Sequence, residues 1–161
     1  MSESAAAKAY ELWKAGEGSE EATGEWWEMT QERINQFADV TEDHQFIHVD
    51  AERAKATPFG GTIAHGFLTL SMLTHLDAIT PNVDEPGRYE GVTMGVNYGF
   101  DKVRFVNPVL AGKRVRARAV TSNVELKGTA INSTRSFTVE IEGEDKPALI
   151  AEWIGRSVFD S

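Results

Sequence analysis

The 161-residue chain contains no cysteine. Disulfides, thiolate nucleophiles and cysteine-based zinc sites are therefore excluded. The sequence also lacks any run that approaches the ~18 consecutive apolar residues of a membrane-spanning helix, so we expect no membrane segment. Residues 1–18 alternate charged residues with alanine and have no apolar core typical of a secretory signal. We therefore expect a cytoplasmic protein.

Basic residues are scarce in this chain. Lysine and arginine together number 16, against 25 aspartates and glutamates, which gives a net charge of −9. Because nucleic-acid binders normally carry a basic surface, we expect no nucleic-acid partner. A polyanionic ligand would have to be met by a local basic patch on an otherwise acidic protein.

The remaining composition is that of an ordinary globular protein, with 41% apolar and 25% charged residues. A chain of this length suits one domain with its own core. The sequence shows no internal repeat and no low-complexity tract. We expect a single domain over residues 1–161, in which residues 1–24 form an N-terminal helix and a connection.

The first half of the chain is predicted to be helical, with polar turns between the helices. The most apolar helix is the last, and its apolar side chains point in nearly every direction, so we expect it to be buried on most sides. Thr30 and Asp50 are the expected N-caps of the second and third helices. The predicted helices span residues 5–14, 30–41, 51–56 and 64–79.

The second half is predicted to form an antiparallel meander, because polar and apolar residues alternate there. Gly128 and residues 142–145 are the expected hairpin turns. The predicted strands span residues 89–98, 102–106, 113–124, 130–141 and 149–159, after a short strand at 26–29. Helices followed by antiparallel strands indicate the α+β class. A buried helix wrapped by one curled antiparallel sheet is the arrangement of the hot-dog fold.

Residues 41–50, Thr-Glu-Asp-His-Gln-Phe-Ile-His-Val-Asp, concentrate unusual chemistry in a short segment. Three carboxylates and two imidazoles stand among two large apolar residues. One interpretation is a solvated turn whose acids cap the neighbouring helices. The other is an acid–base site, because an imidazole titrates near neutral pH and a nearby carboxylate orients it.

A second segment favours the acid–base interpretation. Asp43 and His48, followed by Ile63-Ala64-His65-Gly66, resemble the hydratase-2 signature of MaoC-like dehydratases. The resemblance extends from about residue 36 to residue 112. It departs from the family pattern at Gln45 and Phe46, where the family often has Asn-Pro. This departure leaves the preference for acyl chain length open.

The resemblance implies an (R)-specific enoyl-CoA hydratase, which is equally a 3-hydroxyacyl-thioester dehydratase. Asp43 and His48 would flank one water molecule. One of them would take a proton while the water oxygen attacks the β-carbon of the enoyl thioester, and the pair would deliver a proton to the α-carbon. The main-chain N–H of Gly66 would stabilise the enolate charge on the thioester oxygen, because the first N–H groups of a helix lack internal partners.

Further residues are expected to bind the substrate or to shape its pocket. The candidates for the coenzyme A phosphates are Lys102, Arg104, Arg114, Arg116 and Arg118, and an ordinary solvated strand face is the alternative. The expected substrate-binding residues are Gln45, Phe46, His65, Asn97, Lys102 and Arg104. No metal and no separate cofactor is expected, since coenzyme A belongs to the substrate. The resemblance also implies a homodimer in which two sheets join edge to edge.

Three alternative functions remain open at this point. A hot-dog acyl-CoA thioesterase would use the same fold and direct water at the carbonyl carbon instead. A non-catalytic acyl-CoA-binding protein would retain only the fold. A metal hydrolase would use the oxygen- and imidazole-rich segment around Asp43 and His48 as ligands.

Overall fold

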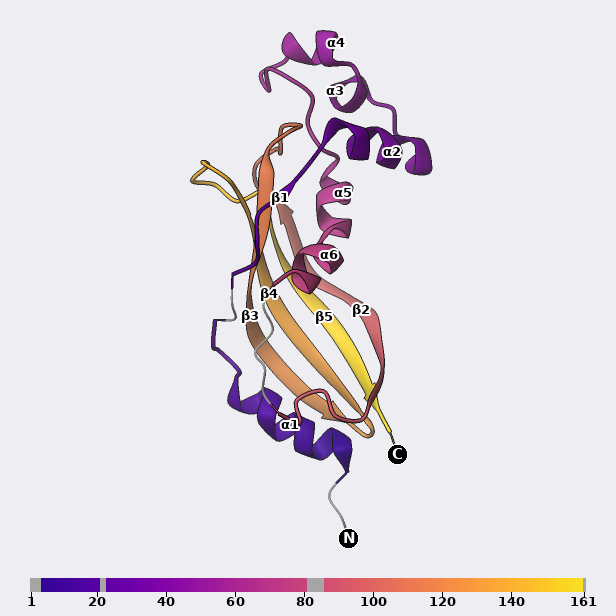
Figure 1. Cartoon of the computed structure of the whole chain (residues 1–161), viewed down its shortest axis with the longest axis vertical. Coiled ribbons are helices and arrows are strands. Elements are labelled where there is room, and N and C mark those ends of the chain that lie inside the picture. The colour runs from indigo at the N-terminus through magenta and orange to yellow at the C-terminus, as the bar shows by residue number, and fades with distance from the viewer. Residues whose placement is uncertain (1–3, 21–22, 81–85, 161) are drawn as a thin grey trace.

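The computed structural model describes residues 4–20, 23–80 and 86–160. Figure 1 shows one long, curled sheet with helices along one face and at both ends. The helices are α1 (Ala5–Ala15), α2 (Gln31–Thr41), α3 (Phe46–Val49), α4 (Ala51–Lys55), α5 (Gly66–Ser71) and α6 (Leu73–Ala78). The strands are β1 (Trp27–Glu28), β2 (Val92–Phe105), β3 (Arg114–Lys127), β4 (Ala130–Ile141) and β5 (Leu149–Phe159).

The helix starts follow the local sequence signals. The side chain of Thr30 accepts a hydrogen bond from the Arg33 N–H at the start of α2. The Asp50 carboxylate accepts one from the Arg53 N–H at the start of α4. Each cap satisfies a main-chain donor that the helix itself leaves unpaired. Both N-cap predictions are confirmed.

The five strands form one antiparallel sheet in the order β1-β3-β4-β5-β2. Strand β2 lies at one end of this order. At the other end, the short β1 pairs with β3, and Glu20 forms an isolated bridge with Val120. The α+β class is confirmed, and strands β4 and β5 have their predicted bounds.

The core lies between the sheet and the pair α5–α6. It includes Leu68, Leu73 and Leu76 from the helices, which pack with Phe137 and Leu149 from the strands. Burying one such side chain contributes about 1.5–3 kcal/mol. A second, smaller cluster joins α1 to the far end of the sheet through Trp13, Ile131 and Phe159. The core therefore anchors the start of α5 against the sheet, near the segment that carries the acid–base candidates.

The predicted helix at 64–79 differs from the structure in two respects. It is divided at Met72 into α5 and α6. It is also not buried on most sides, because Phe67 is 68% exposed and Ser71, Thr74 and His75 on the same side are exposed as well. The physical reason is that one sheet covers only one face of a helix. The ring of His75, on this exposed side, lies against the ring of Trp27.

Two further expectations are corrected. The strands predicted at 89–98 and 102–106 form the single strand β2, which absorbs its irregularities as register shifts against β5 near residues 93, 98 and 101. The segment 41–50, predicted as a turn, contains the single helical turn α3. Among the described residues, no helix combines the length and the apolar character needed to cross a membrane.

Candidate active site

Asp43 and His48 lie on either side of a sharp change in chain direction. Helix α2 ends at Thr41, and its C-cap residue Glu42 adopts a left-handed conformation with φ of 59°. Asp43 follows in the turn, and Gln45 is the N-cap of α3, whose third residue is His48. The turn folds the chain back on itself. The carboxylate and the imidazole, five positions apart, are thereby brought to the same side.

His48 is buried, with 7% of its surface exposed. Its Nδ1 lies 2.7 Å from the main-chain oxygen of Ile63. Because a carbonyl can only accept, Nδ1 carries the proton, and Nε2 of the neutral ring keeps its lone pair. Burial lowers the pKa of His48, and so does the neighbouring His65; the Ile63 bond and Asp43 act in the opposite direction. The net effect favours a neutral base.

His65 contacts both of the other residues. Its Nε2 donates to the main-chain oxygen of Asp43 at 2.9 Å. Its ring stacks on the His48 ring, with 3.8 Å between centroids. Phe37 packs on it as well. The Nδ1 atom of His65 is buried and has no hydrogen-bond partner among the described residues.

The Asp43 carboxylate and the two imidazoles converge. One side-chain oxygen or nitrogen from each of Asp43, His48 and His65 lies within 4.8 Å of the others. Two hydrogen bonds of about 2.8 Å that meet at a single water oxygen span roughly 4.6 Å between their outer atoms. The spacing therefore suits one water molecule held between the carboxylate and the imidazole.

The same three side chains are potential metal ligands. A ring nitrogen offers its lone pair within the plane of the ring. The His48 and His65 rings are stacked with only 25° between their planes. Their lone pairs therefore run side by side and do not converge on one ion.

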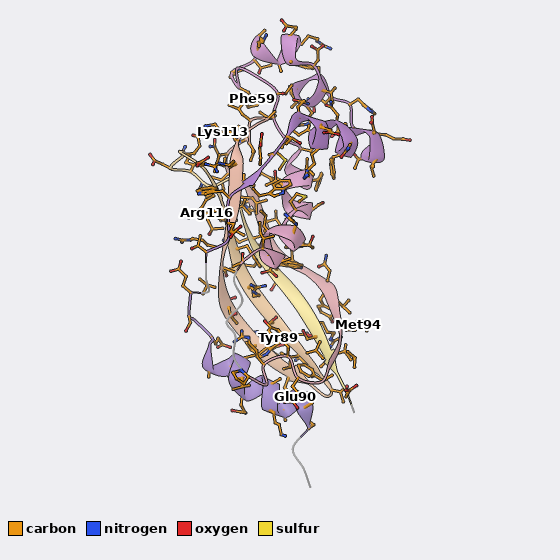
Figure 2. All side chains as sticks on the ribbon, in the orientation of Figure 1. Phe59, Tyr89, Glu90, Met94, Lys113 and Arg116 are labelled. Carbon is orange, nitrogen blue, oxygen red and sulfur yellow. The ribbon has the colours of Figure 1, made fainter. Side chains whose placement is uncertain are left out.

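An apolar pocket of about 320 Å³ adjoins His48 and the start of α5. Gly66 is the first residue of that helix. Its backbone is closely approached by the Phe105 ring, since a Cβ built on Gly66 would lie 3.0 Å from Cδ1 of Phe105. The pocket is lined by His48, Phe59, Ile63, Ala64, Gly66, Thr69, Phe105, Val106, Asn107, Pro108, Val109 and Ala148. Figure 2 shows Phe59 on the loop beyond the sheet, near α4.

The candidate substrate-binding residues are spread more widely. Gln45 is exposed next to Asp43, and its main-chain N–H points to the Asp43 carboxylate at 3.4 Å. The Phe46 ring lies under the Arg53 guanidinium at 4.2 Å and does not line the pocket. Asn97, on β2, accepts a hydrogen bond from the Trp153 indole. These three residues and His65 are not gathered around the pocket.

Lys102 and Arg104 are exposed on β2. Val103 packs against the core and Phe105 covers Gly66, so the alternation of a strand directs Lys102 and Arg104 to the opposite face of the sheet. No ion pair within the described residues involves either cation. By contrast, Arg114, Arg116 and Arg118 on β3 all pair with glutamates. Figure 2 shows Arg116 at the β3 side of the sheet.

Sequence reasoning missed several residues that build the site. Phe59 and Phe105 line the pocket. The side chains of Gln31 and Thr62 hydrogen-bond to each other, and Gln31 also reaches the main chain of His48. The sequence contains no signal for these contacts, since a glutamine after an N-cap is ordinary helix surface.

The comparisons with known proteins agree with this architecture. A family model described as the MaoC like domain matches residues 16–142, which is more than half of the chain. The chain belongs to this MaoC-like family. Its relatives include Nodulation protein N of Rhizobium meliloti (strain 1021), 50% identical over 145 residues that cover 89% of this chain and 87% of that protein.

A second relative is 3-hydroxyacyl-thioester dehydratase Z of Mycobacterium tuberculosis (strain CDC 1551 / Oshkosh). It is 48% identical over 145 residues, covering 89% of this chain and 92% of the relative. Among solved structures, the R-hydratase PhaJ1 from Pseudomonas aeruginosa in the unliganded form has a TM-score of 0.65 at 21% identity, covering 89% of this chain and 83% of that one. The hot-dog fold is confirmed, and the chain is an enzyme of the hydro-lyase class.

Proposed function

We propose that the chain adds water reversibly to a trans-2-enoyl-CoA and forms an (R)-3-hydroxyacyl-CoA. The observation that carries the proposal is the convergence of the Asp43 carboxylate and the His48 imidazole within 4.8 Å, beside an apolar pocket. A relative at 48% identity is named a 3-hydroxyacyl-thioester dehydratase, which is the same reaction in reverse. Hydration and dehydration share one transition state, so one site serves both directions.

In this proposal His48 is the base. Its Nε2 accepts a proton from the bound water while the water oxygen forms a bond to the β-carbon. Asp43 accepts the second hydrogen bond of the water and orients it. The electron pair of the double bond moves onto the thioester as an enolate. The proton on His48 then passes to the α-carbon, so that hydroxyl and hydrogen are added across the former double bond and the ring is neutral again.

The enolate charge needs a hydrogen-bond donor. We assign this role to the main-chain N–H of Gly66, because the first N–H groups of a helix have no partner within it and because Gly66 lines the pocket. The absence of a side chain lets the thioester approach the backbone closely. One such donor contributes about 10²–10³-fold in rate.

The apolar wall of the pocket suits an acyl chain. Phe59, Phe105 and Pro108 offer surface without hydrogen-bonding demands. Lys102 and Arg104 remain the predicted ligands of the coenzyme A phosphates; because both are exposed on the face of β2 opposite Phe105, this role requires coenzyme A to reach around the β2 edge of the sheet. Coenzyme A belongs to the substrate, so the proposed reaction needs no cofactor and no metal.

We also propose that the chain is a homodimer joined along β2. This strand lies at the end of the sheet order and has no further strand partner within the described residues. It is 14 residues long and exposes Met94, Val96, Tyr98 and Phe105. A long, apolar edge strand is normally covered. The cytoplasmic location and a single domain over residues 1–161 stay predictions.

A hydration assay with crotonyl-CoA tests the proposed function. We expect loss of the enoyl absorbance and, by chiral analysis, an (R)-3-hydroxybutyryl product. His48→Ala should lower turnover by about 10²–10⁴-fold. His44→Ala is the matched control, because His44 is exposed and pairs with Asp39.

Three other results would contradict the proposal. Release of free thiol with the double bond intact would favour a thioesterase. Binding of acyl-CoA without turnover by the parent protein would favour a non-catalytic binder. Loss of activity in a chelator, with recovery on adding a metal ion, would favour a metal enzyme.

A further inference from the structure

Gln31, the first residue of α2, forms three hydrogen bonds with its side-chain amide. The Nε2 group donates to the main-chain oxygen of His48 at 2.7 Å and to Oδ1 of Asn35 at 2.8 Å. The Oε1 atom accepts a bond from the hydroxyl of Thr62. Both N–H groups and the carbonyl of the amide are therefore engaged.

Two of these bonds join the two chain segments that hold the catalytic imidazole. His48 lies on α3, whereas its acceptor, the Ile63 oxygen, belongs to the segment before α5. The Ile63 N–H also donates to the Ile47 oxygen at 3.0 Å. The Gln31 amide forms a second link between the same segments: it bonds His48, which follows Ile47, and Thr62, which precedes Ile63. The hydrogen bond from His48 Nδ1 to the Ile63 oxygen therefore joins two segments that are also held together by the Ile63–Ile47 bond and by the Gln31 amide.

Loss of the Gln31 amide would leave buried polar groups without hydrogen-bond partners. Thr62 and His48 are each 7% exposed. Without the amide, a carbonyl and a hydroxyl in this buried region would lack a partner. The two segments would then separate or rotate to reach water. Either movement would displace the Ile63 oxygen from Nδ1 of His48.

We propose that Gln31 is a positioning residue of the hydratase reaction: its amide fixes the main chain of His48 against Thr62 and thereby keeps the His48 ring bonded to Ile63, with Nε2 facing the water. The inference rests on the proposed function, in which His48 is the base. Gln31 itself touches neither the water nor the substrate.

The pH dependence gives a readout that simple loss of stability does not change. The titratable groups that face His48 are Asp43 from the turn after α2 and His65 from the start of α5. Methionine at position 31 adds no charge to this set. The Ile63 bond raises the pKa of His48. Loss of that bond should therefore move the acid limb of the kcat/KM profile to lower pH.

The test compares Gln31→Met, Thr62→Val and the double variant, with Asn35→Ala as the control. Gln31→Met keeps the length of the side chain and removes its polar atoms. We expect kcat to fall about 10–100-fold, as for a misplacement of the order of 1 Å, with KM nearly unchanged. Thr62→Val should show a smaller fall. The kcat of the double variant should equal that of Gln31→Met, since both substitutions break the same link between His48 and Thr62. Asn35→Ala should have the kcat, KM and pH profile of the parent.

A second measurement does not depend on activity. The ¹⁵N shifts of the His48 ring in the substrate-free protein should report a proton on Nδ1 in the parent, and a mixture of tautomers in Gln31→Met. If Gln31→Met does not fold, Thr62→Val, which removes a single hydroxyl, takes its place in both measurements.

The outcomes separate the two proposals. A parent protein that hydrates neither crotonyl-CoA nor a longer trans-2-enoyl-CoA overturns the proposed function, and the ring shifts then decide the role of Gln31 alone. An active parent with a Gln31→Met variant of equal kcat, equal pH profile and unchanged His48 tautomer overturns the role of Gln31. A Tm that falls while these three readouts stay constant overturns it too, because Gln31 would then be structural only.

Discussion

Replacing Gly66 with alanine tests whether the reaction needs open backbone at the start of α5. A Cβ at this position would lie 3.0 Å from Cδ1, 3.1 Å from Cε1 and 3.2 Å from Cγ of Phe105. Ordinary contact begins near 3.4 Å, so the ring must retreat by a few tenths of an ångström. Phe105 is 51% exposed at the end of β2, which leaves it room to move.

The expected loss of stability is therefore small. Overpacking costs about 1–3 kcal/mol, and an exposed ring should place the cost at the lower end. Alanine also costs less backbone entropy than glycine on folding, a gain of at most about 0.5–1 kcal/mol at the first residue of a helix. The net change should be about 0–2 kcal/mol. At this chain length, each kcal/mol lowers Tm by about 2–4 °C.

The expected loss of activity is much larger than the loss of stability. The new methyl group would stand beside the Gly66 N–H, against the Phe105 ring, and we expect it to narrow the approach of the thioester oxygen to that donor. We expect kcat/KM for crotonyl-CoA hydration to fall about 10²–10³-fold, as for the loss of one oxyanion donor. Gly61→Ala is the matched control, because its Cβ would meet only Cδ2 of Leu110 at an ordinary 3.5 Å.

The double variant Gly66→Ala/Phe105→Leu separates steric crowding from loss of the donor. Removing the ring should restore Tm and leave the activity low. Full activity in Gly66→Ala would refute the assignment of Gly66. Recovery of activity together with Tm in the double variant would refute it as well, since the loss would then arise from the displaced ring.

Three further outcomes are expected. Because the folded protein lowers the pKa of His48 below its ordinary value of about 6.5, the stability gained from a neutral ring should be fully present above that pH and be lost as the pH falls through the folded pKa. Urea unfolding of the parent and of His48→Gln, repeated across this pH range, measures the effect. An equal dependence of the free energy of unfolding on pH in the two proteins would contradict it. Gly24→Ala should destabilise by about 1–3 kcal/mol, because its Cβ would lie 2.6 Å from Oγ1 of the buried Thr80; an unchanged Tm would show that this contact relaxes freely. Val96→Lys on the β2 edge should convert the proposed dimer to monomer in sedimentation at micromolar concentration, whereas a dimer of unchanged affinity would place the interface elsewhere.

Local signals explain why so much of the fold was predictable. Thr30 and Asp50 were expected as N-caps, and each cap depends only on main-chain groups three residues away. Strands β4 and β5 match their predicted bounds, since alternation along a half-buried strand is visible in the sequence itself. The sequence predicts two strands where β2 is continuous. Its register shifts fit into one strand only through pairing with β5, which the sequence of β2 does not reveal.

The exposure of α5 and α6 was decided outside the helices. Their apolar residues predicted burial on most sides, yet Phe67 is largely exposed. A helical pattern records which side chains are apolar and not how many surfaces are available to cover them. The number of covering layers is a property of the tertiary structure.

The sequence by itself determined the residue types of the candidate site, because an aspartate, a histidine and a glycine-led helix start resemble a known family pattern. Only the tertiary structure decided how the His48 ring is oriented, through the Ile63 oxygen and the Gln31 amide. Phe105 likewise reaches Gly66 only in the folded chain. These contacts join segments far apart in the sequence, and each exists only once the sheet and the helices have fixed the distance between them.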